Sequence, residues 1–106
     1  MAELILEYST SITTADGQRF IPRAYGEERP DGTWIGWLEF TPTDGKGTTL
    51  RTERETTQPN KFALEYWASG LEPIYFEGAF ERAQRLLGSA TSASEGTKSV
   101  QAPANQ

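Results

Sequence analysis

The chain has 106 residues, a formal net charge of −5, no cysteine and no histidine. The absence of cysteine excludes disulfides, thiolate nucleophiles and zinc–thiolate sites, and the absence of histidine removes the commonest general base and metal ligand. Ten basic residues face fifteen acidic ones. Because nucleic acids and anionic membranes attract basic patches, we expect one small domain whose partner is another protein.

The N-terminal sequence MAELILEYST has neither a basic region nor a long apolar stretch. It therefore shows no secretory signal. No segment of the chain has the roughly 18 consecutive apolar residues of a membrane-spanning helix. We expect a cytoplasmic protein that binds no membrane.

Four segments in the first half of the chain have the composition of β-strands. They lie at about 3–9, 18–28, 33–41 and 48–56, and turns rich in glycine and aspartate separate them. Pro22 predicts that its strand lies at a sheet edge or carries a bulge, because proline cannot donate to the ladder. The charges and threonines of 48–56 are typical of an exposed edge strand.

The segment Pro30-Asp31-Gly32 predicts a three-residue hairpin loop between the second and third strands. This loop sets the register of the hairpin. On one face it pairs Tyr25 with Trp37, and further pairs on that face are Glu27 with Ile35 and Arg23 with Glu39. On the other face it pairs Gly26 with Gly36, Ala24 with Leu38 and Pro22 with Phe40.

After Thr57 the pattern becomes helical, and we predict a helix at 59–69. Pro59 fits its first turn, with Thr57 or Gln58 as cap, and Gly70 fits its C-terminal end. The helical face of Phe62, Ala63, Tyr66 and Trp67 is expected to pack on the uncharged face of the hairpin around Ala24, Leu38 and Phe40.

The segment from Glu72 to Gly88 allows two interpretations. Apolar residues from Phe76 to Leu87 keep helical spacing, whereas Ile74 and Tyr75 prefer strands. We favour a fifth strand at 72–77 followed by a helix at 78–88. The small and polar residues that follow predict a disordered tail at 89–106, which leaves 1–88 as a single domain.

The second face of the hairpin carries an aromatic pair flanked by opposite charges, a mixture typical of the centres of protein interfaces. The predicted partner-binding residues are Arg23, Tyr25, Ile35, Trp37 and Glu39. Two plainer alternatives remain. The aromatic pair can simply stabilise the hairpin, or a helix such as 78–88 can cover it.

No motif predicts catalysis, a metal or a cofactor. In DGKGTT, Lys46 is followed by glycine, so the segment fails as a phosphate loop. As a calcium loop it would place Pro42 and Lys46 at ligand positions. No spacing singles out a pair of carboxylates of the kind that glycosidases use.

We therefore expect an α+β protein with an antiparallel sheet of four to five strands, acting as a non-enzymatic interaction or accessory module. Its partner is another protein or a second copy of the chain. The alternative is a small-ligand-binding domain, or a carboxylate-based enzyme, with a pocket between sheet and helix. That pocket would use Glu65, Tyr66, Trp67, Tyr75 and Glu77.

Overall fold

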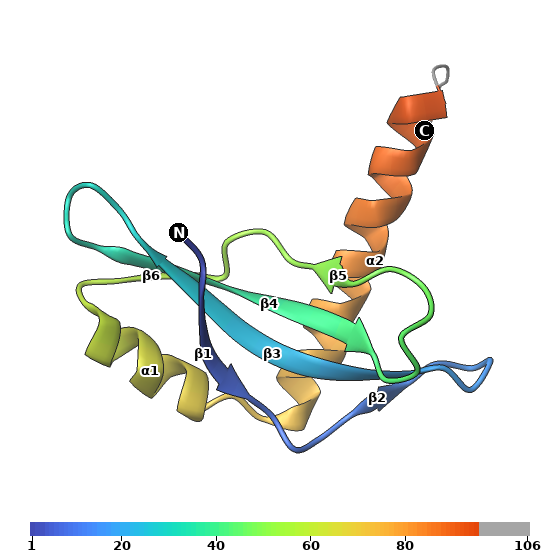
Figure 1. Cartoon of the computed structure of the whole chain (residues 1–106), viewed down its shortest axis with the longest axis horizontal. Helices are drawn as coiled ribbons and strands as arrows, with labels where there is room; N and C mark the ends of the chain where they lie inside the picture. Colours follow the sequence, from blue (N-terminus) through green and yellow to red (C-terminus); the bar gives the residue numbers. More distant parts are fainter. Residues whose placement is uncertain (96–106) are drawn as a thin grey trace.

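A computed structural model describes the backbone of residues 1–95 and the side chains as far as Leu87. Six antiparallel strands form one sheet, and two helices follow them (Figure 1). The elements are β1 (Glu3–Glu7), β2 (Ile12–Thr13), β3 (Arg19–Glu28), β4 (Trp34–Pro42), β5 (Leu50–Arg51), β6 (Thr56–Gln58), α1 (Lys61–Ser69) and α2 (Pro73–Glu95). The predicted α+β class is confirmed. No described helix is both long and apolar enough to cross a membrane.

The long β3–β4 hairpin forms the centre of the sheet (Figure 1). β1 and β2 pair with β3, while β5 and β6 pair with β4. Every cross-strand pair predicted from the loop is present, including Tyr25 with Trp37 and Ala24 with Leu38. Gly32 has φ of 89°, and the Arg29 amide donates to the Thr33 carbonyl over 2.7 Å, which closes the loop as expected.

Pro22 does not mark an edge strand, because β3 has neighbours on both sides. On one side β1 pairs with residues 23–26 and β2 pairs with residues 19–20. Pro22 lies between these two ladders, and its carbonyl accepts from the Tyr8 amide over 3.2 Å. The missing N–H therefore coincides with the interruption between β1 and β2, where no ladder bond is lost.

The strand predicted at 48–56 is only partly right, because two short strands, β5 and β6, replace it, with β5 at the edge of the sheet. Thr52, which is buried, interrupts the ladder between them. Its hydroxyl accepts from the Leu38 amide over 3.0 Å, and its own amide donates to the Leu38 carbonyl over 2.9 Å. The Thr52 hydroxyl thus takes the place of a backbone carbonyl as acceptor. The chain leaves the sheet after Thr52 and returns at Glu55, whose amide donates to the Gly36 carbonyl.

Helix α1 begins at Lys61, two residues after the predicted start. Its N-cap is Asn60 rather than Thr57 or Gln58. The Asn60 side chain accepts from the Ala63 amide over 2.8 Å, which satisfies an amide that the helix itself leaves unpaired. Gly70 ends the helix as predicted.

The predicted buried face of α1 is wrong for Phe62 and Tyr66, although Trp67 does pack against the core. Leu64 and Ala68 are fully buried, whereas Phe62 and Tyr66 point outward and Trp67 is half-buried. The cause lies in the sheet, where Gly26 and Gly36 are paired across β3 and β4. A Cβ at either glycine would collide with the Leu64 side chain, so Leu64 occupies a notch that these two residues leave open. A bulkier aromatic ring would not fit there.

The predicted strand at 72–77 is also wrong, because these residues belong to α2. Pro73 fits the first position of a helix, where its missing N–H costs nothing, and the Tyr75 amide donates to the Glu72 carbonyl. The predicted helix 78–88 is the continuation of α2. The helix is described as far as Glu95. Residues 96–106 of the predicted tail lie outside the described part of the chain. The disorder of 89–106 stays a prediction.

Both helices pack on the same face of the sheet. From α2, Phe76, Ala79, Phe80 and Ala83 join the core. The Phe80 ring lies 5.0 Å from the ring of Phe20 and 5.2 Å from that of Phe40. The expected core face, with Ala24, Leu38 and Phe40, is therefore confirmed, although α2 supplies most of its cover.

The glycine notch gives a direct test of this packing. An alanine Cβ at position 36 would lie 2.6 Å from a methyl carbon of Leu64, which is confined on all sides. We expect Gly36→Ala to lower the free energy of unfolding by about 1–3 kcal/mol, measured by urea denaturation. In a Leu64→Ala background the same change should cost far less. An equal loss in the free energy of unfolding in both backgrounds would contradict the contact between Leu64 and Gly36.

Candidate functional site

The face of the sheet opposite the helices forms the first candidate site, which we call the open face. It carries the outward side chains of β3 and β4 and their neighbours. Leu4 lies opposite Tyr25, and its side chain is 50% exposed. Ile35 lies opposite Thr57 and is half-buried. Neither α1 nor α2 covers the open face, because the described buried residues of both helices pack on the opposite face of the sheet.

Trp37 lies at the centre of the open face, yet it is only 1% exposed. Tyr25 stacks beside it with ring centroids 6.4 Å apart. The Arg51 guanidinium carbon lies 4.2 Å from the centroid of the indole, in the position of a cation–π contact. The indole N–H donates to Glu39 over 3.0 Å. Trp37 is therefore the buried centre of the open face. It orients Arg51 and Glu39, and the residues around it form the surface that solvent reaches.

The five residues predicted to bind a partner all lie together on the open face. Arg23 forms an ion pair with Glu7 over 3.0 Å. The sequence interpretation missed two members of this surface, Leu4 and Arg51. Leu4 could have been found from the outward position of its strand. Arg51 could not, because its place opposite Glu39 depends on how β5 ends at Thr52.

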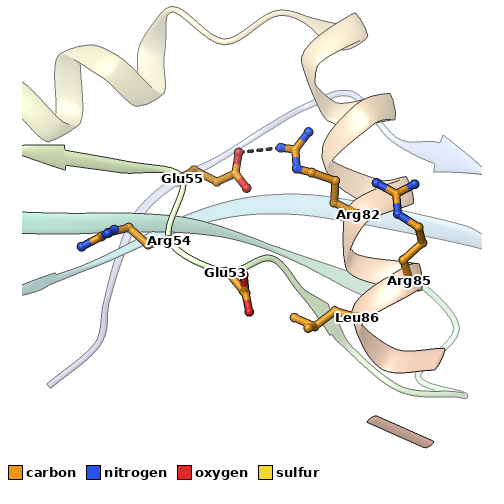
Figure 2. A pocket seen from close by; sticks show the side chains of 6 residues that line it. All are labelled: Glu53, Arg54, Glu55, Arg82, Arg85 and Leu86. Atoms are coloured by element: carbon orange, nitrogen blue, oxygen red, sulfur yellow. Dashed lines mark hydrogen bonds and ion pairs between the residues drawn. The ribbon is translucent and has the colours of Figure 1, made fainter. Parts of the chain in front are cut away.

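The second candidate site is a cleft of about 510 Å³ between α2 and the chain segment that leaves β5 (Figure 2). Its lining residues are Glu53, Arg54, Glu55, Arg82, Arg85 and Leu86. Figure 2 shows Arg82 projecting from α2 toward Glu55 of this segment and Arg85 beside it on the same helix, whereas the Arg54 side chain points away from them.

The side chain of Glu55 is held in place by two hydrogen-bond donors in the cleft, and it is only 9% exposed. Its Oε1 accepts from Arg82 Nη2 over 2.6 Å and also from the Tyr75 hydroxyl. The Arg82 guanidinium in turn lies 5.8 Å from the centre of the Tyr75 ring. Burial and the hydrogen bond to Glu55 raise the pKa of Tyr75 to about 12.

The five residues of the predicted alternative pocket do not line one cavity. Glu65 and Tyr66 are exposed on the outer side of α1. Trp67 meets Tyr75 edge to face, with centroids 6.4 Å apart. Glu77 lines a separate depression beside β2. Only Tyr75 reaches the cleft, through Glu55. Sequence reasoning missed Glu55, Arg82 and Arg85, since the cleft depends on the break between β5 and β6.

Among the side chains that the structure describes, which end at Leu87, no group of three or more acidic residues is placed to hold a metal ion. No family model matches the chain, and no curated protein or solved structure matches it either.

The phenol of Tyr75 gives a prediction about pH. Its pKa is raised above its ordinary value of 10.0, so the folded state favours the protonated phenol. The resulting stabilisation is complete below pH 10 and is lost as the pH rises toward about 12. We expect the free energy of unfolding to fall more steeply over this range in the unsubstituted protein than in Tyr75→Phe. Tyr66→Phe, which changes an exposed tyrosine, is the control, and identical slopes in all three proteins would refute the coupling.

Proposed function

We propose that the chain is a non-enzymatic protein-interaction module that binds its partner through the open face. The observation that carries this proposal is the placement of both helices on one side of the sheet. The other side keeps Leu4, Tyr25 and Ile35 in contact with solvent around the buried Trp37. Although antiparallel sheets often leave one face to water, such faces are normally polar.

The composition of the open face supports a protein as partner. Tyrosine and arginine are enriched where interfaces concentrate their binding energy, and here Tyr25, Arg23 and Arg51 surround an apolar centre. The surface is also pre-organised, because Trp37 holds Arg51 by its ring and Glu39 by its N–H. Ordering these side chains on binding would therefore cost little conformational entropy.

The absence of histidine and cysteine supports a role outside catalysis, since the commonest general base and the most nucleophilic side chain are missing. The charges of the open face are balanced by neighbours, as Arg23 is by Glu7. We therefore assign the binding energy to the apolar centre and the orientation of the partner to the charged rim.

A photo-crosslinking side chain at position 35 tests the proposal in cells. The captured protein is identified, purified and titrated against the unsubstituted chain. Ile35→Glu should weaken its binding at least about tenfold, because a charge would enter the apolar centre. Ile74→Glu is the matched control, since Ile74 is an exposed isoleucine on α2. An unchanged dissociation constant in Ile35→Glu would reject the open face as the binding surface.

A small ligand in the cleft is a second candidate function. The observation that favours it is Glu55, a largely buried carboxylate that Tyr75 and Arg82 hold in place, with Arg85 in the same cleft. Such a cleft could hold a small polar molecule between the arginines and the glutamates.

A thermal-shift screen of metabolites, sugars and calcium tests the cleft. A ligand at 100 times its dissociation constant should stabilise the protein by about 2.7 kcal/mol and raise its melting temperature. The shift should disappear in Arg85→Gln and persist in Arg29→Gln, because Arg29 is exposed at the hairpin loop and does not line the cleft. A flat response across the screen would count against this function.

A further inference from the structure

The outer side of α1 exposes two large aromatic rings one turn apart. Phe62 is 77% exposed and Tyr66 is 76% exposed. Glu65 and Ser69, which are also exposed, share this side of the helix. We call Phe62, Glu65 and Tyr66 the α1 surface. Folding gains little from either ring in this position, because neither is removed from water.

The backbone beneath the α1 surface is held firmly. Leu64 and Ala68, on the opposite side of the helix, are completely buried. The first turn is capped by Asn60, and Lys61 forms an ion pair with Glu3 of β1. The two rings are therefore presented from a fixed helix, so a partner would pay little to order the surface that it binds.

The charges around the α1 surface are acidic on balance. Lys61 is the only basic residue of α1, and its ammonium pairs with Glu3 and also interacts with Glu65. Glu65 remains as an exposed carboxylate beside both rings. The faces of aromatic rings carry negative potential, so they attract cations as the carboxylate does. Two ring faces and a carboxylate thus combine apolar area with an attraction for positive charge.

We propose that the α1 surface docks a basic segment of a partner protein, which places an arginine or lysine side chain against the Phe62 and Tyr66 rings and near Glu65. Apolar neighbours of that cation would cover the edges of the rings. The net charge of −5 favours the approach of a basic partner. This surface lies on the helix side of the sheet, so its docking role does not depend on the open face.

A synthetic amphipathic peptide of about 14 residues, with leucine on one side and arginine on the other, is the probe. Its binding is followed by the amide shifts of the full chain in NMR and by calorimetry. We expect the largest shifts at residues 61–70. Phe62→Ser combined with Tyr66→Ser should weaken binding at least about tenfold, and Glu65→Gln about threefold. Because all three side chains are exposed, the melting temperature should change little.

The matched controls separate this surface from the rest of the molecule. Glu81→Gln makes the same change of charge at an exposed position of α2 and should leave binding unchanged. Ile35→Glu should also bind the peptide normally, so failure of the open face and failure of the α1 surface give different results. A peptide with glutamate in place of arginine should not bind.

Four outcomes would overturn the proposal. The first is an arginine peptide that does not bind, and the second is binding that survives loss of both rings. The third is self-association of the chain that Phe62→Ser and Tyr66→Ser abolish, measured by sedimentation, since the occupant would then be a second copy. The fourth is binding to vesicles of neutral phospholipid that requires the same two rings, since the occupant would then be a membrane.

Discussion

The contact between Leu64 and the paired glycines of β3 and β4 fixes how α1 lies on the sheet. Gly26 and Gly36 lie opposite each other, and their missing side chains let α1 approach the sheet closely. The position of Leu64 in this notch fixes which side of α1 is buried. It also leaves Phe62 and Tyr66 in solvent, and it places α1 on the same side of the sheet as α2.

Because both helices lie on one side, the two faces of the sheet have different roles. The covered face is filled by side chains from α2 and by Leu64, Trp67 and Ala68 of α1. The open face has to shield its own largest side chain, and it does so with Tyr25 and Arg51 over Trp37. The molecule thus presents an apolar centre with mixed charges on one side and an aromatic surface with a carboxylate on the other.

The sequence predicted those parts of the fold that local chemistry decides. Pro30, Asp31 and Gly32 specify a loop, the loop specifies a register, and the register places all five predicted open-face residues together. The predicted face of α1 failed because aromatic residues were assigned to the core by size, whereas the notch admits only a side chain such as Leu64. The break at Thr52, and with it the cleft, depends on a hydroxyl that takes over a ladder bond, which no local pattern reveals.

The wrong prediction that Phe62 and Tyr66 are buried draws attention to the exposed side of α1. Sequences usually agree at every level with the structures they form, and disagreements concentrate where function imposes its own demands. The errors at 48–56 and 72–77 are of another kind, because a buried threonine and a proline at the first position of a helix explain them completely.

The stacking of Arg51 over Trp37 has an optical consequence. The chain has three tryptophans, and the emission of an indole depends on its contact with water and with neighbouring charges. Arg51 and Glu39, which contact the Trp37 indole, both belong to the open face. Any molecule that moves Arg51 or Glu39 therefore alters the environment of this fluorophore, and the open face carries its own intrinsic fluorescent reporter.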